Sequence, residues 1–226
     1  MGSSRFSCVL WDVDGTIADA SAGILPRIEI VLGELGKPSI PADQVNRWIG
    51  PPMLESFQLL AGLSLDDATK AVARYRELAS LQGYANSVRL YDGVVDVIRE
   101  VHAAGVPQTT ASTKPGNQID AIFEHFELTE LFVAVHGATP TAAVNDTKTD
   151  VLRRALDDMR SRGVDISRPV LIGDRHHDID GAAELGEGYP EVPVIFARWG
   201  FGSAEEEAGA LTAVDTPAAL RDALLG

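Results

Sequence analysis

The feature of the sequence that most constrains its fold is an alternation of short apolar runs with amphipathic helical segments. Apolar or β-branched runs occupy residues 6–11, 106–111, 131–135, 170–172 and 192–196. Most are separated by segments with helical periodicity, at residues 94–104, 117–126 and 149–162. Strands that alternate with helices form a parallel sheet covered on both faces. The pattern therefore predicts an α/β fold with a Rossmann-like, doubly wound parallel sheet.

One long region has no convincing strand. Between residues 23 and 88 the apolar side chains recur at helical spacing, most clearly in the stripe of Ala68, Ala71, Val72, Tyr75 and Leu78. Loops rich in glycine and proline at residues 49–53 and 86–94 bracket or interrupt this region. We therefore predict an α/β catalytic core of residues 1–19 and 90–226, with an all-α cap domain of residues 20–89 inserted into it.

Composition excludes several classes of partner. The chain of 226 residues has a net charge of −14, which disfavours binding to nucleic acid or to an anionic lipid surface. No apolar stretch approaches the length of a membrane span, and the N-terminus lacks the features of a secretory signal. We expect a cytoplasmic protein with no membrane partner, whose single cysteine, Cys8, is a buried apolar residue.

Polar residues follow the apolar runs, where parallel strands deliver side chains to one edge of the sheet. These residues are Asp12, Asp14, Ser112, Thr113, Lys114, Asp174 and Asp178, with Lys148 near the start of a helical segment. Several carboxylates in one site need a counter-charge, and Mg²⁺ prefers such hard oxygen ligands. Lys148 and Ser112 would complement the oxygens of a bound phosphate, which leaves a carboxylate free to attack phosphorus.

Four motifs carry a resemblance to a known family. DVDGT, ASTKP, a lysine that opens a helix and VLIGDRHHDIDGA occur in this order along the chain. This order resembles the haloacid dehalogenase-like superfamily, in its phosphatase branch with a helical cap. IGPPMLESF, ASTKP, GDRHHDIDGA and ARWGFGS are together similar to the phosphoglycolate phosphatase-like group and its 5′-nucleotidase-like relatives. The resemblance covers essentially the whole chain.

The resemblance implies a role for each matching residue. Asp12 matches the nucleophile that forms an aspartyl phosphate, and Asp14 matches the general acid and base. Lys148 matches the lysine that steadies the nucleophile and the transferred phosphoryl group. The implied Mg²⁺ ligands are Asp12, the backbone carbonyl of Asp14 and Asp174. Asp178 is a second acidic residue that binds the ion directly or through water, or that orients Lys148. Residues two apart on an extended strand face the same side, so both carboxylates of the DxD pair point toward one substrate.

Other residues are expected to contact the substrate. Ser112 matches the phosphate-binding hydroxyl of the family, and we add Thr16, Thr113 and Lys114 as neighbouring contacts. Arg47 is a candidate for reading the leaving group, as are three other residues of the predicted cap: Met53, Ser56 and Tyr75. Each of these cap residues equally fits a packing role or a solvated helix position.

Two further features have simpler interpretations than a catalytic one. His176 and His177 are adjacent, so their rings point apart on most backbones, and no cysteine accompanies them. We predict a solvated pair rather than metal ligands. Trp11 precedes Asp12 and faces the opposite side of the strand, which predicts a position in the core.

The sequence thus predicts a Mg²⁺-dependent phosphatase acting on a small phosphorylated metabolite, most similar to a phosphoglycolate phosphatase. Three alternatives remain open: a 5′-nucleotidase acting on nucleoside monophosphates, a sugar-phosphate mutase with the same core motifs, and a phospho-acceptor signalling module. A signalling receiver has no use for a helical insert after its first strand, which favours the enzyme. We expect a monomer or a weak homodimer.

Overall fold

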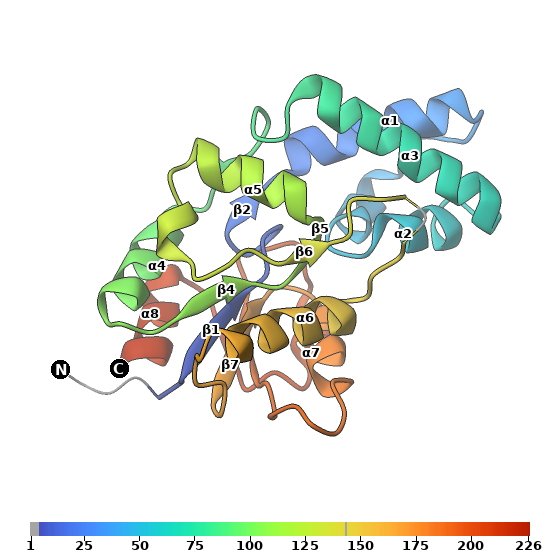
Figure 1. Cartoon of the computed structure of the whole chain (residues 1–226). Coiled ribbons are helices and arrows are strands. Elements are labelled where there is room, and N and C mark those ends of the chain that lie inside the picture. The colour runs from blue at the N-terminus through green and yellow to red at the C-terminus, as the bar shows by residue number, and fades with distance from the viewer. Residues whose placement is uncertain (1–4, 143) are drawn as a thin grey trace.

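The computed structural model describes residues 5–142 and 144–226, which form a five-stranded parallel sheet with helices on both faces (Figure 1). The strands lie in the order β4 (Gln108–Thr110), β1 (Cys8–Trp11), β7 (Pro169–Gly173), β8 (Val194–Ala197) and β9 (Thr212–Val214). Every pairing between neighbours is parallel. The predicted doubly wound α/β fold is therefore confirmed.

The central strand β1 is buried on both faces because its side chains alternate between two apolar clusters. Val9 and Trp11 pack with residues of α4 (Val94–Ala103), α5 (Gly116–His125) and α8 (Pro217–Leu225). Cys8 and Leu10 pack with residues of α6 (Lys148–Ser161) and α7 (His176–Ala183). Trp11 and Cys8 are fully buried, as predicted.

A group of helices lies beyond the sheet, at the upper right of Figure 1: α1 (Ser21–Glu34), η1 (Ala42–Trp48), α2 (Met53–Leu59) and α3 (Leu65–Gln82). The predicted apolar stripe of α3 is buried. Where the chain enters and leaves this group, β2 (Ala18–Asp19) pairs antiparallel with β3 (Arg89–Leu90). We therefore continue to propose a core of residues 1–19 and 90–226 with a cap of residues 20–89.

The prediction of a strand at residues 131–135 is wrong. This segment begins with the end of η2 (Thr129–Leu131) and forms only an isolated bridge, between Ala134 and Thr109. Two carbonyl groups of this segment accept hydrogen bonds from side chains of β4: Gln108 donates to Leu131 O, and Thr109 donates to Ala134 O. A regular ladder starts later, between β5 (Ser112–Pro115) and β6 (Gly137–Ala138). The short strand β9 was not predicted.

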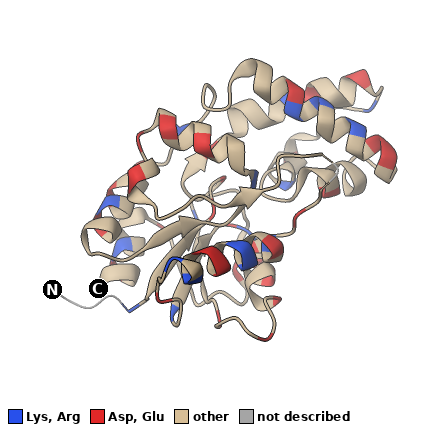
Figure 2. Ribbon diagram, viewed as in Figure 1, with Lys and Arg blue, Asp and Glu red and all other residues tan. Residues whose placement is uncertain are grey.

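Charged residues of both signs lie along the outer helices (Figure 2). On α3, for example, Arg74 pairs with Glu77 at 2.7 Å, and both side chains are exposed to solvent in large part. Exposed pairs of this kind contribute little to stability, so the two apolar clusters carry most of it. Among the described residues no helix is both long and apolar enough to cross a membrane.

Candidate active site

The register of the sheet brings the ends of β4, β1 and β7 to the same level. Trp11 lies opposite Thr110 on one side and Ile172 on the other. Asp12 then continues the β7 pairing, since its N–H donates to Ile172 O at 2.8 Å. The residues that follow these strands, Ser112 and Asp174 among them, therefore converge with Asp12 on one edge of the sheet.

Lys148 is the cation at the centre of this edge. It is the first residue of α6, a position fixed by a capping box between Thr147 and Asp150. Its Nζ lies 2.5 Å from Asp12 Oδ1 and 2.7 Å from Asp178 Oδ1. Burial disfavours the charged amine, but the two carboxylates outweigh this effect and raise the pKa of Lys148. Lys148 therefore remains an ammonium ion.

Three buried carboxylates form a cluster with the right donors for a hard cation. One oxygen each of Asp12, Asp174 and Asp178 lies within 4.8 Å of the others. Burial raises the pKa of Asp174, and the charges of Asp12 and Asp178 raise it further. Burial also raises the pKa of Asp12, opposed by Lys148 and by a hydrogen bond with Ser112. A divalent cation would relieve this repulsion, so the residues present fit Mg²⁺.

The Asp174 carboxylate is held in place by two neighbouring loops. Phe201 N–H donates to Asp174 Oδ2 at 2.8 Å, and the Thr16 hydroxyl donates to Oδ1 at 3.4 Å. Gly15 has a φ of 89° and packs so closely that a Cβ on it would overlap this carboxylate. The glycine of the DVDGT motif therefore provides both a left-handed turn and room for Asp174.

We expect Gly15→Ala to lower the free energy of unfolding by about 2–4 kcal/mol, because it adds backbone strain to an overlap with Asp174. Gly33→Ala is the matched control, since Gly33 lies in α1 and an added Cβ meets nothing within 4 Å. This control is expected to be neutral or stabilising by up to about 1 kcal/mol. Denaturant unfolding of both variants is the measurement, and equal stability would show that the loop around Gly15 yields without cost.

Asp14 forms a second buried ion pair, separate from that of Asp12. Lys114 Nζ lies 2.8 Å from Asp14 Oδ2 and 3.0 Å from Oδ1. The backbone N–H of Lys114 also donates to the Ser112 hydroxyl at 3.2 Å. The two carboxylates of the DxD pair thus have different lysine partners, one on α6 and one on β5.

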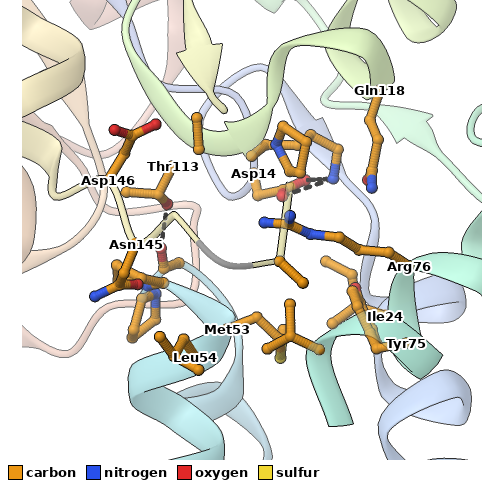
Figure 3. Close-up of a pocket in the computed structure, with 18 of the residues that line it drawn as sticks. Asp14, Ile24, Met53, Leu54, Tyr75, Arg76, Thr113, Gln118, Asn145 and Asp146 are labelled. Carbon is orange, nitrogen blue, oxygen red and sulfur yellow. Dashed lines mark hydrogen bonds and ion pairs between the residues drawn. The ribbon is translucent and has the colours of Figure 1, made fainter. Parts of the chain in front are cut away.

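A cavity of about 60 Å³ lies between the helical group and the end of the sheet (Figure 3). Asp14 lines it together with Lys114, Thr113 and Gln118 from the core, and Met53 and Arg76 from the helices. Asp12 is not among the lining residues and is only 4% exposed. A substrate therefore reaches Asp12 only if the helical group moves or the lining side chains rearrange.

Side chains of two core residues, Thr113 and Arg175, bind the helical group. The Thr113 hydroxyl donates to Gly50 O at 2.7 Å. Arg175, next to Asp174 in the chain, donates to Asn46 O at 2.9 Å and to Ile49 O. Glu206 also accepts a hydrogen bond from Arg175 Nε at 2.8 Å, which orients the guanidinium group.

The sequence profile described as "Haloacid dehalogenase-like hydrolase" matches residues 9–188, a range that contains every carboxylate of this edge. The chain belongs to this hydrolase family. The match agrees with the order of the motifs and with the convergence of Asp12, Lys148 and Asp174.

Several curated relatives are similar to this hydrolase over most of its length. Tyrosine-protein kinase PtkA of Mycobacterium tuberculosis is 33% identical, covering 96% of this chain and 70% of the kinase. A 5′-nucleotidase of Pseudomonas aeruginosa is 32% identical, covering 89% and 87%. A phosphoglycolate phosphatase of Caulobacter vibrioides is 30% identical, covering 85% and 79%.

Among solved structures, a predicted phosphatase from Clostridium acetobutylicum superimposes on this hydrolase with a TM-score of 0.85. It is 30% identical, and the match covers 96% of this chain and 97% of that one. These comparisons confirm the predicted family and enzyme class, a phosphoric monoester hydrolase.

Some predicted site residues of the hydrolase lie elsewhere than expected. Arg47 is exposed and lines a different hollow, with Ser56 and His177. Thr16 is fully buried against Asp174 and does not line the cavity. The two histidine rings do not point apart, since their centroids lie 3.9 Å from one another. Both residues are partly exposed, His176 bonds Glu206, and burial lowers the pKa of His177 to about 4.

The structure also reveals residues that the sequence did not single out. Arg76 lines the cavity, Phe201 binds Asp174 through its backbone, and Arg175 holds the helical group. Arg175 lies inside the GDRHHDIDGA motif, so the sequence did contain a signal that this residue belongs to the site. Arg76 is one of two arginines two residues apart in an amphipathic helix, and nothing in the sequence separates it from exposed Arg74.

Proposed function

We propose that this hydrolase is a Mg²⁺-dependent phosphatase that removes phosphate from a small metabolite through an aspartyl phosphate on Asp12. One observation carries the proposal. The Asp12 carboxylate lies at the end of the central strand, bound by Lys148 and grouped with Asp174 and Asp178, while Asp14 faces the adjacent cavity. A nucleophile, a cation and a second carboxylate for proton transfer are thus present on one edge.

In the first step, an Asp12 oxygen forms a bond to phosphorus as the bond from phosphorus to the leaving oxygen breaks. Asp14 gives its proton to that leaving oxygen. In the present structure Asp14 is paired with Lys114 at 2.8 Å. We infer that substrate binding draws Lys114 toward the phosphate and frees Asp14 to take up the proton that it later donates.

In the second step, water attacks phosphorus and Asp14 accepts its proton, which releases phosphate and restores Asp12. Lys148 holds the Asp12 carboxylate in place throughout and opposes the negative charge of the phosphoryl group. Ser112 is 1% exposed, and its hydrogen bond with Asp12 supports a role for its hydroxyl in binding a phosphate oxygen.

Asp12, Asp174, Asp178 and the backbone carbonyl of Asp14 would hold the ion. When bound, Mg²⁺ supplies positive charge that neutralises the phosphate oxygens and the carboxylate cluster. The bond-making and proton-transfer steps described above are carried out by the side chains of the protein.

Mg²⁺ at about a hundredfold excess over its Kd is expected to raise the thermal midpoint by about 5–10 °C. Asp174→Asn is expected to remove this increase, and to leave the metal-free protein no less stable, because burial already raises the pKa of Asp174 and disfavours its charge. Calorimetry with and without Mg²⁺ is the measurement, with exposed Asp92→Asn as the control. An undiminished increase in Asp174→Asn would remove this residue from the ligand set.

The small cavity favours a small leaving group. Its volume of about 60 Å³ is far below the roughly 300–1,000 Å³ of sites for drug-sized ligands. We therefore propose 2-phosphoglycolate as the leading substrate, ahead of a nucleoside 5′-monophosphate. Relatives of the chain are named for each activity, one as a 5′-nucleotidase and one as a phosphoglycolate phosphatase. Phosphate release from 2-phosphoglycolate, several 5′-mononucleotides, hexose phosphates and a phosphorylated amino acid, with and without Mg²⁺, tests the proposal.

The kinase relative supports a second candidate, in which the phosphoryl group of Asp12 passes to a protein hydroxyl instead of water. Incubation with ATP and a tyrosine-containing protein distinguishes the two. Phosphotyrosine without release of phosphate from any monoester would favour the kinase. Magnesium-dependent release centred on one small monoester would favour the phosphatase.

A further inference from the structure

Arg76 on α3 is a cation with no hydrogen-bond or ion-pair partner in residues 5–142 and 144–226. Its guanidinium group points into the cavity toward Asp14 (Figure 3). Its Nη1 is buried and has no hydrogen-bond partner among the described residues. The chain carries 33 acidic residues against 19 basic ones, so carboxylates are plentiful, yet none of them pairs with this arginine in the described part of the chain. Buried donors normally have a partner, and an unpaired one is costly.

Asp146 attracts Arg76 but is not its hydrogen-bond partner. Burial lowers the pKa of Arg76, and Tyr75 and then Asp146 oppose this effect. However, both carboxylate oxygens of Asp146 are already bound, at 2.9 and 3.0 Å by Arg154, and a backbone N–H of Thr139 also donates to it. Asp146 therefore attracts Arg76 without forming a hydrogen bond to it.

The other charged groups around the cavity are neutralised or neutral. Lys114 is paired with Asp14. Burial raises the pKa of Tyr75 to about 12, so its phenol is uncharged, and the Arg27 guanidinium lies 5.2 Å from the centre of its ring. Val72, one turn before Arg76 on α3, contributes an apolar surface. Arg76 is thus the uncompensated cation among the described residues that line this cavity.

We propose that Arg76 binds a carboxylate on the leaving group of the substrate, so that this hydrolase selects small phosphorylated organic acids over neutral phosphomonoesters. The inference rests on the proposed phosphatase function. A guanidinium group presents paired donors that match a carboxylate, which gives both affinity and orientation. With phosphorus at Asp12 and the carboxylate at Arg76, the leaving group spans the cavity past Asp14, the proposed proton donor.

The test compares two substrates that share a phosphoryl group and differ in the carboxylate, 2-phosphoglycolate and ethyl phosphate. Arg76→Met is expected to lower kcat/KM for 2-phosphoglycolate by about 10- to 100-fold and to change that for ethyl phosphate by less than about threefold. Arg76→Lys is expected to restore part of the loss. Lys70→Met is the control, because Lys70 lies on the same helix with an exposed side chain. Equal losses for both substrates, or no loss for either, would overturn the proposal.

A binding experiment separates this inference from the phosphatase function. Titration calorimetry of 2-phosphoglycolate into Asp12→Asn, with and without Arg76→Met, requires no turnover. We expect the double variant to bind about 10- to 100-fold more weakly. Equal affinities, or no binding to Asp12→Asn, would overturn the role of Arg76. One further outcome is that the wild-type protein turns over no phosphomonoester while this difference in affinity is still found. That result would contradict the phosphatase function but support the carboxylate site at Arg76.

Discussion

Asp12→Asn is expected to lower phosphate release by about ten thousandfold or more, because an amide oxygen is too weak a nucleophile to form the aspartyl phosphate. The fold should survive, since Asn retains the shape of the side chain and burial already makes the charge of Asp12 costly. Phosphate release measured at saturating substrate and Mg²⁺, together with circular dichroism, checks both parts.

Asp92→Asn is the matched control for this variant, because it makes the same chemical change at an exposed turn position. Its activity is expected to match that of the wild-type protein. Turnover within about tenfold of wild type in Asp12→Asn would exclude Asp12 as the nucleophile. Equal losses in both variants would point to a general effect of charge instead.

Lys148→Met is expected to be the most destabilising change at the site. Lys148 is the shared counter-ion of Asp12 and Asp178, at 2.5 and 2.7 Å, so its loss leaves a cluster of buried carboxylates without positive charge. Removing one partner of a buried ion pair typically costs about 3–5 kcal/mol. Denaturant unfolding of the metal-free protein measures this loss, and turnover should fall with it.

Added Mg²⁺ should recover part of the stability of Lys148→Met, since the ion replaces some of the missing positive charge. Arg99→Met is the control: Arg99 is exposed and its nearest acid, Asp96, lies 3.6 Å away. We expect it to change stability by less than about 0.5 kcal/mol. A loss below about 1 kcal/mol in Lys148→Met would show that the carboxylates do not depend on this lysine.

Much of the sheet, and of the polar edge proposed as the active site, followed from the sequence for a physical reason. Parallel strands end on one side, so polar residues directly after apolar runs must converge there. This rule brought Asp12, Ser112 and Asp174 together without knowledge of any distance. It failed at residues 131–135, where an apolar run passes beside β4 with one isolated bridge and gives carbonyls to β4 side chains instead of forming a regular ladder.

The helical group could not be predicted in the same detail. An amphipathic pattern tells which face of α3 is buried, but not which core loop that face approaches. Arg47 and Arg76 are alike on those grounds, yet only Arg76 lines the cavity with Asp14. That difference depends on how Thr113 and Arg175 bind the Gly50 loop, which are contacts between segments far apart in sequence.

Direct detection of the aspartyl phosphate is the sharpest test of the proposed mechanism. Wild-type protein would be mixed with 2-phosphoglycolate and Mg²⁺, quenched in acid within the first turnover, digested, and its peptides examined by mass spectrometry. We expect one added phosphoryl group, on Asp12, and none in Asp12→Asn. Substrate turnover with the phosphoryl group on another residue, or with no covalent phosphoryl group at any time, would contradict the assignment of Asp12 as the nucleophile.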